Sequence, residues 1–283
     1  MRTFDCFPFF NELDLLALRL AELDSVVDYF VISEAPVTFQ GRSKPLHFAE
    51  AASRFAAYAH KIRHVIVDDM PGGDDPWKRE LHQRNALRRG LSDASPDDYV
   101  LISDADEIVT PVALRQGVAL NSFAWYEQRL AVYYLNMEVT ERPTGLWSKV
   151  YGAPWKEIEA LSDLSQPRFA EPAHFRTIGQ PIPHAIIANA GWHFSWMGGI
   201  DGMLDKLKAT SHTEERVQEW YAPEKLRKAM EDGVYFAEGA RIAPVKLTEL
   251  PEYVTANQRE LVQMGLLPKP SSIFERIKRT LNI

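Results

Sequence analysis

The stretch YVLISDADEI, residues 99–108, runs from apolar residues straight into a cluster of acids. Its first part is typical of a strand that is buried on both faces. Asp104, Asp106 and Glu107 then place three carboxylates within four positions. Carboxylates this close repel one another unless a cation lies between them. The end of this strand is therefore the first candidate site.

Three earlier segments have the same form, being apolar runs rich in β-branched and aromatic residues. These predicted strands cover residues 3–10, 26–33 and 64–69. Between these strands, apolar residues recur at helical spacing, which predicts helices over residues 11–23, 50–60 and 77–91. Such alternation predicts a parallel, doubly wound α/β sheet, in which ligands bind beyond the carboxyl ends of the strands. The acids predicted at those ends are Glu34, Asp68, Asp69, Asp104 and Asp106.

The second half of the chain has a different pattern. Residues 122–139 and 184–196 are aromatic and partly alternating, which predicts longer strands in a mixed sheet. Helical patterning returns at 199–209 and 223–236. Because no internal repeat is visible, we expect a single domain over residues 1–268, followed by a tail.

That tail, residues 269–283, is basic and amphipathic. Its apolar positions on one helical face are Ile273, Phe274, Ile277 and Leu281, and its basic residues are Lys269, Arg276, Lys278 and Arg279. Such a helix can lie on an anionic membrane surface, where a lipid-linked acceptor is found. The alternative is that the tail docks on its own domain or on a partner subunit.

Composition limits the class of protein. The 283 residues carry 39 acids against 32 bases, a net charge of −7, which argues against nucleic acid as a partner. Cys6 is the only cysteine, so an intrachain disulfide and a cysteine-based zinc site are excluded. The first residues lack a signal-peptide pattern, and no apolar run approaches the roughly 18 residues of a membrane span. We expect a cytoplasmic protein, with peripheral contact at the inner membrane face if the tail binds lipid.

Asp104 and Asp106 suit a divalent cation. They lie two residues apart where a buried strand leaves the sheet, and hard oxygen donors suit Mg²⁺ or Mn²⁺. An ion held in this way commonly also binds a substrate diphosphate. His193 or His212 could complete the shell, since Mn²⁺ accepts imidazole. The alternatives are acids that only cap a turn and a His193 that belongs to the core.

The helix predicted from Trp77 carries a charged pair on or beside its apolar stripe. Glu80 and Arg84 are four residues apart, and a charged pair that faces inward is costly unless it is partnered. Arg84 is therefore either half of a structural ion pair with Glu80 or a ligand contact.

Several stretches together resemble glycosyltransferase family 17, the β-1,4-mannosyl-glycoprotein 4-β-N-acetylglucosaminyltransferase family. In chain order they are DCFPFFNELDLLALRLAEL, VVDYFVISEAPVTFQGRSKPLHF, the W-x-x-E-x-x-Q-R-N run of residues 77–85, SDADEI, and GWHFSW followed by KLKATSHTE. The resemblance covers about residues 3–215. It is far more specific than an isolated Asp-x-Asp.

The resemblance implies a GT-A fold, which is Rossmann-like with a mixed central sheet flanked by helices. It also implies a UDP-sugar donor, UDP-N-acetylglucosamine, with Mn²⁺ or Mg²⁺ and an inverting transfer. Residues 1–110 would form the nucleotide-binding half and 111–268 the acceptor-side half. Asp104 and Asp106 match the metal-binding Asp-x-Asp. Because the membrane anchor and luminal cysteines of animal members are missing, we expect a bacterial surface polysaccharide or another glycan, such as a lipid-linked one, as acceptor.

An inverting transfer needs a carboxylate base opposite the leaving group. Asp201 resembles the acidic segment that carries the base in other inverting GT-A enzymes, although it could simply cap a helix. Glu214 and Glu107 are the alternatives. Lys206 or Lys149 could pair with the diphosphate, or both could be solvated surface lysines.

Donor recognition should use the end of the first strand. Phe7 or Phe9 could stack on uracil, Asn11 could hydrogen-bond to it, and Glu34 could lie near the ribose. Arg84 would contact the nucleotide or the diphosphate. The first four could equally be core residues or helix caps.

Two other functions compete with sugar transfer. A haloacid-dehalogenase-like phosphohydrolase would use Asp104 as nucleophile, but it normally has Thr or Val where this chain has Ile108, and it carries the motif on its first strand. A glycan-binding protein without turnover would use the aromatic middle of the chain.

Overall fold

The computed structural model describes residues 1–142, 146–177, 183–214, 217 and 219–269. The chain divides into two compact units. The first comprises Met1–Gln128 and Trp147–Gly191, and the second comprises Arg129–Leu146 and Trp192–Ile283. Each unit therefore combines two separate stretches of the chain.

The first unit is built around a mixed sheet. Its strands are β1 (Thr3–Pro8), β2 (Tyr29–Glu34), β3 (Ile62–Ile66), β4 (Tyr99–Ile102), β5 (Glu107–Val109), the first half of β6 (Ala124–Val132), β8 (Trp147–Pro154) and β9 (Ala185–Ile187). Its α-helices are α1 (Leu13–Leu23), α2 (His47–Ala51), α3 (Pro76–Asn85), α4 (Pro111–Leu120), α5 (Trp155–Glu159), α6 (Gln166–Phe169) and α7 (Pro172–Thr177). Two 3₁₀ helices, η1 (Ala52–Tyr58) and η2 (Ala86–Leu91), follow α2 and α3.

The first four strands are parallel, in the order β4-β1-β2-β3. Cys6 of β1 is paired with Val31 of β2 on one side and with Ile102 of β4 on the other. Strand β8 runs antiparallel to β4 and β6, which makes the sheet mixed. The predicted mixed α/β sheet with flanking helices is confirmed, and the carboxyl ends of the parallel strands meet at one edge.

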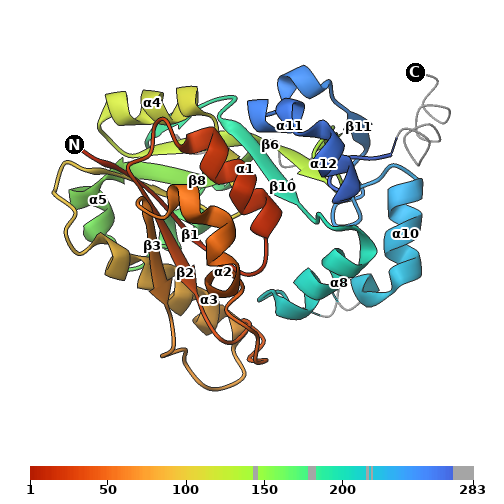
Figure 1. The fold of residues 1–283 in the computed structure, drawn as a ribbon, viewed down its shortest axis with the longest axis horizontal. Helices are drawn as coiled ribbons and strands as arrows, with labels where there is room; N and C mark the ends of the chain where they lie inside the picture. The colour runs from red at the N-terminus through yellow and green to blue at the C-terminus, as the bar shows by residue number, and fades with distance from the viewer. Residues whose placement is uncertain (143–145, 178–182, 215–216, 218, 270–283) are drawn as a thin grey trace. The chain divides into compact units, whose positions relative to one another are not determined.

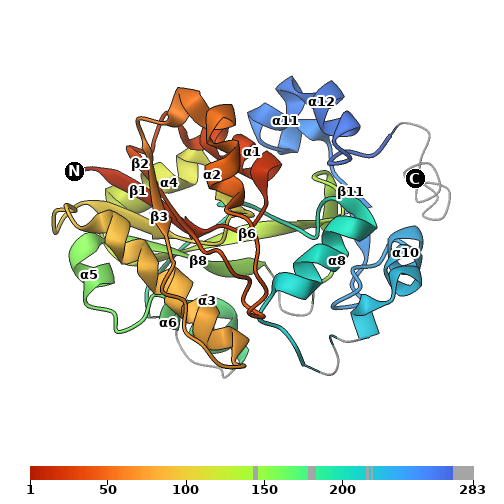
Figure 2. The same ribbon diagram turned by 60° about the horizontal axis from the view of Figure 1, so that its bottom comes forward.

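Helices cover both faces of this sheet (Figures 1 and 2). Helices α1, α2 and α4 lie on one face, and α3, α5 and α6 lie on the other. Successive residues of β1 alternate between the two layers: Phe7 packs with Leu16 and Leu20 of α1, whereas Cys6 packs with Leu87 of η2. Apolar layers on both sides explain why the strands read as continuous apolar runs.

Helix α1 begins one residue later than a cap at Asn11 would give. Leu13 is its first residue, and Glu12 precedes it without a side-chain capping bond. Asn11 is therefore not the cap. Instead, Glu12 accepts hydrogen bonds from the backbone N–H groups of Phe10 and Asn11, both at 3.1 Å, and so fixes the turn after β1.

The second unit has a smaller sheet and its own core. Its strands are the second half of β6, β7 (Met137–Val139), β10 (Gly191–Ser195), of which Gly191 belongs to the first unit, and β11 (Ile242–Pro244). Its helices are α8 (Gly199–Ala209), η3 (Glu219–Tyr221), α10 (Pro223–Glu231), η4 (Leu247–Glu249), α11 (Glu252–Ala256) and α12 (Gln258–Gln263). Strand β10 is parallel to β6, and β7 is antiparallel to both β6 and β11.

No helix within the described ranges has both the length and the apolar character that a bilayer span requires. The predicted amphipathic tail lies outside these ranges from residue 270 onward.

Candidate active site

The turn after β4 is closed by two hydrogen bonds between Asp104 and Glu107. Glu107 accepts a hydrogen bond from the Asp104 backbone N–H at 2.6 Å, and its own N–H donates to the Asp104 carbonyl at 3.0 Å. Ser103 ties the turn to β1 by donating its N–H to the Cys6 carbonyl at 3.2 Å. The Asp104 side chain is 33% exposed, whereas Asp106 is buried. The strand therefore ends in a tightly hydrogen-bonded turn whose Asp104 carboxylate faces solvent in part.

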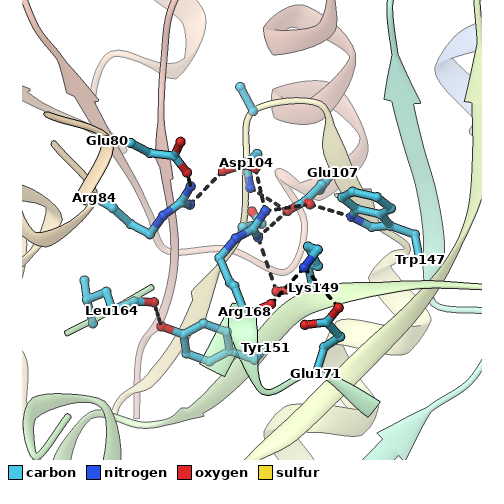
Figure 3. A network of polar contacts seen from close by, with 12 residues as sticks. Glu80, Arg84, Asp104, Glu107, Trp147, Lys149, Tyr151, Leu164, Arg168 and Glu171 are labelled. Carbon is cyan, nitrogen blue, oxygen red and sulfur yellow. Dashed lines mark hydrogen bonds and ion pairs between the residues drawn. The ribbon is translucent and has the colours of Figure 1, made fainter. Parts of the chain in front are cut away.

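Two arginines from different helices hold Asp104 (Figure 3). Arg84 of α3 donates to Oδ1 at 2.6 Å, and Arg168 of α6 donates to Oδ2 at 2.5 Å. Both guanidinium groups are almost fully buried, with 2% and 7% of their side chains exposed. Arg84 also donates to Glu80 at 3.1 Å. The pairing of Glu80 with Arg84 is thus present, and Asp104 extends it.

Glu107 is a structural carboxylate at this turn. Its Oε1 accepts from Trp147 Nε1 at 2.6 Å and from Arg168 Nη2 at 3.0 Å. Its Oε2 accepts from Arg168 Nη1 at 2.7 Å and from the Asp104 N–H. The side chain is fully buried, so it cannot reach the hydroxyl of an incoming acceptor. This corrects the prediction of Glu107 as an alternative base.

Several ionised side chains gather at the turn. The guanidinium groups of Arg84 and Arg168 lie among the carboxylates of Glu80, Asp104 and Glu107, with Asp106 close to Asp104. Burial raises the pKa of Asp104 and the nearby Asp106 raises it further, but the charges of Arg168 and Arg84 outweigh both and lower that pKa to about 2. Asp104 is therefore ionised near neutral pH, as a carboxylate that binds a cation must be.

The oxygen donors at the turn fit a divalent cation that arrives together with a phosphate ligand. Mg²⁺ is usually held by one or two carboxylates plus substrate phosphates, and both Mg²⁺ and Mn²⁺ prefer oxygen donors of this kind. Among the described residues, no group of three or more His, Cys, Asp or Glu side chains is arranged to hold a metal by itself. Asp104 and Asp106 would hold the ion, with phosphate oxygens as further ligands.

The sequence profile of glycosyltransferase family 17 matches residues 1–238, most of the chain. The chain belongs to glycosyltransferase family 17. This membership confirms the resemblance carried by the motifs. It leaves the phosphohydrolase alternative without support.

Curated relatives of this family 17 chain include two named β-1,4-mannosyl-glycoprotein 4-β-N-acetylglucosaminyltransferase, from Homo sapiens and Rattus norvegicus. Each is 28% identical over 228 residues, which amount to 70% of this chain. The match covers 41% of the human protein and 40% of the rat protein. The family 17 chain thus spans about two fifths of the length of these relatives.

Similar solved structures include a mannosyltransferase from Pyrobaculum calidifontis in complex with GDP-Man and Mn²⁺. The alignment covers 99% of the family 17 chain and 87% of the mannosyltransferase, with a TM-score of 0.37 and 13% identity.

The aromatic residues predicted to stack on uracil belong to the core of the first unit. Phe7 is fully buried, and the guanidinium carbon of Arg19 lies 4.2 Å from its ring centre. Phe9 is 1% exposed and packs edge-on against Phe48. Because helices α1 and α2 cover this face of the sheet, neither ring is open to a base, and the prediction is corrected. Asn11 is exposed ahead of α1.

Glu34 is also enclosed, at the end of β2. It accepts a hydrogen bond from the Phe48 N–H at 3.0 Å and lies 3.0 Å from His64 Nε2 and 3.6 Å from Lys44 Nζ. Burial raises the pKa of Glu34, but these hydrogen bonds and the Lys44 charge lower it more, so the group stays ionised. A fully buried, fully engaged carboxylate does not reach a ribose, which corrects that prediction.

Five of the predicted residues belong to the second unit. His193 is buried in β10, and Asp201 is exposed in the first turn of α8. Lys206 of α8 donates to Ser195 Oγ at 3.3 Å and lies 5.3 Å from the ring centre of Trp196. His212 and Glu214 form an exposed pair, with Nδ1 and Oε1 3.2 Å apart.

Sequence reasoning missed Arg168, which Lys149 supports. Arg168 binds both Asp104 and Glu107 but comes from a segment without periodicity, so no pattern marked it. Lys149 donates to the Arg168 carbonyl at 2.9 Å and to Glu171 at 3.0 Å, so its amine supports α6 (Figure 3).

Proposed function

We propose that this family 17 protein is an inverting, metal-dependent glycosyltransferase. It would transfer N-acetylglucosamine from a UDP-sugar to a glycan or lipid-linked glycan acceptor, on a GT-A scaffold. The single observation that carries the proposal is the partly exposed Asp104 carboxylate, held between two buried arginines beside Asp106. The names of the curated relatives support the choice of sugar.

The two arginines would have different roles in donor binding. Arg168 is anchored by paired hydrogen bonds to Glu107, so it keeps Asp104 in place when the donor arrives. Among the described residues, Arg84 donates hydrogen bonds to Asp104 and Glu80 only, and its buried Nε has no hydrogen-bond partner. Arg84 is therefore the residue that would turn to a diphosphate oxygen, since guanidinium groups bind phosphate well.

Asp104 and Asp106 would hold Mn²⁺ or Mg²⁺ together with the donor diphosphate. When bound, such an ion neutralises charge on the departing diphosphate. The buried arginines keep Asp104 ionised and therefore ready to bind a cation.

Asp201 is the proposed base for the acceptor hydroxyl, and Glu214 is the alternative. Asp201 is exposed at the start of α8, whereas Glu214 is paired with His212. A carboxylate that removes a proton from the acceptor is what an inverting transfer requires.

The test is incubation of the full chain with UDP-N-acetylglucosamine, Mn²⁺ and a panel of free and lipid-linked glycans. We expect release of UDP, a product heavier by one N-acetylhexosamine, and a β-linkage by NMR. EDTA should stop the reaction, and added Mn²⁺ should restore it. Phosphate release from sugar phosphates would instead indicate a phosphohydrolase. Donor or glycan binding without any UDP release would indicate a binding protein.

A further inference from the structure

A fully buried ion pair lies beneath the carboxylate turn. Asp5 of β1 and Arg19 of α1 are both completely buried. Arg19 Nε donates to Asp5 Oδ2 at 2.7 Å, and Nη2 donates to Asp5 Oδ1 at 2.5 Å. The ring of Phe7 lies against the same guanidinium group. This pair is distinct from the arginines that hold Asp104 by its side chain.

The remaining donors of Arg19 all point at the turn. Nη2 also donates to Ser103 Oγ at 2.5 Å. Nη1 donates to the backbone carbonyls of Asp104 and Glu107, both at 2.9 Å, and lies 3.4 Å from that of Ala105. The turn is thus folded around one guanidinium group, which contacts its backbone.

Stability alone does not account for this pair. Removing two charges from water is costly, and well-packed apolar residues at such a place usually stabilise a protein equally or better. The planar guanidinium fork, however, satisfies several carbonyls that converge on one point, which neither an apolar side chain nor a lysine can do. Its geometry therefore matches the task of shaping the turn.

We infer that Arg19, oriented by Asp5, is a positioning residue for donor and metal binding. By fixing the carbonyls of residues 104, 105 and 107, it sets the direction in which the Asp104 and Asp106 side chains leave the turn. This inference rests on the proposed function of those two carboxylates. Arg19 itself is enclosed in the core and touches neither sugar nor phosphate.

The decisive experiment replaces both charges with apolar groups in the full chain, as Asp5→Leu/Arg19→Met. Because the pair disappears as a whole, no charge is left buried alone, so the protein should still fold, with a melting temperature lowered by the loss of the donor to the turn carbonyls. Misplaced carboxylates should nevertheless lower kcat/KM about 100-fold. The loss should appear in the KM for UDP-N-acetylglucosamine and in the Mn²⁺ requirement, with the acceptor KM unchanged.

A matched control is Arg2→Met/Asp98→Asn, which removes an ion pair at the opposite end of β1 and β4. This control should leave every kinetic constant unchanged. If Asp5→Leu/Arg19→Met is folded and transfers sugar within about threefold of the native rate, or if its loss falls equally on donor and acceptor KM, the inference is overturned.

A second variant covers the case in which the double variant does not fold. Arg19→Lys keeps the charge beside Asp5, but a single ammonium cannot satisfy the converging carbonyls. We expect a folded protein with a raised donor KM. A native donor KM in this variant would contradict the inference.

Asp104→Asn separates this inference from the proposed function. If Asp104→Asn remains active, the proposed function itself fails. If Asp104→Asn is inactive while both Arg19 variants retain native kinetics, only the positioning role of Arg19 fails.

Discussion

The two ends of the parallel strands in the first unit both carry arginine–carboxylate networks, but the networks differ in kind. At the starting end, Arg2 and Arg63 pair with Asp93 and Asp98. There the Asp93 side chain is 54% exposed and both arginines are partly exposed, although Asp98 is buried. At the other end, the guanidinium groups of Arg84 and Arg168 are buried, and the Asp104 carboxylate is partly exposed.

This difference separates a structural network from a binding site. Ion pairs between exposed side chains contribute little to stability. Buried arginines are costly to leave unpaired, and at the other end they hold a carboxylate that is itself partly exposed to a ligand. Both ends would look alike in a list of ion pairs, so the burial of the arginines carries the distinction.

The largest expected effect is at Asp104. Asp104→Asn keeps the shape of the side chain but removes the charge that the cation needs, so kcat/KM for sugar transfer should fall about 100- to 1,000-fold. Far-UV circular dichroism should be unchanged. The control is Asp93→Asn at the starting end, which should transfer sugar at the native rate. Equal losses of kcat/KM in Asp104→Asn and Asp93→Asn would mean that the two ends do not differ in their role in sugar transfer.

Arg168 tests how much of the site depends on burial. Arg168→Ala leaves Asp104 and the buried Glu107 without their shared partner, so the free energy of unfolding should fall by about 3–5 kcal/mol, with loss of activity. Arg168→Lys keeps the charge, so it should retain more stability and more activity than Arg168→Ala. Urea unfolding and donor KM measure the two effects. A loss as small as that of Asp93→Asn, about 1 kcal/mol or less, would mean that the two ends are energetically equivalent.

The strands and the position of the site were predictable because their signals are local. An apolar run that ends in acids marks both the strand β4 and the turn after it, and alternation with helices implies the parallel order. The covered face of β1 was not predictable in the same way. Phe7 and Phe9 alternate with other residues, but only the packing of α1 and α2 shows that both rings are enclosed.

Arg168 could not be predicted, because it lies 61 residues from Glu107 in a segment without periodicity. Asp5 and Arg19 did leave a signal. Asp5 is the only charged residue of its strand, and Arg19 lies on the buried leucine face of the next helix, whose other charges, Asp14 and Glu22, are not buried. Two such charges of opposite sign in neighbouring elements predict a buried pair, which is a stronger inference than either charge alone permits.

A smaller effect is expected at Trp147, which donates a hydrogen bond to Glu107. Trp147→Phe keeps the ring but removes the hydrogen bond to Oε1, so the protein should lose about 1–2 kcal/mol of stability. Glu107 retains Arg168 and the Asp104 N–H, so the donor KM should change by no more than about threefold. A large rise in donor KM would mean that Trp147 also touches the ligand.

The smallest effect is a pH dependence at the starting end of the strands. Hydrogen bonds from Arg63 and Arg2 lower the pKa of Asp93 below its ordinary value of 3.8. Its stabilising contribution is therefore complete above pH 3.8 and is lost as the pH falls below that value. Urea unfolding of the native protein and of Asp93→Asn should show a small stability difference near pH 6 that shrinks toward about pH 3 and in high salt. A difference that does not change with pH would mean that Asp93 acts through shape rather than charge, and the starting end would then not be the simple surface network that the comparison requires.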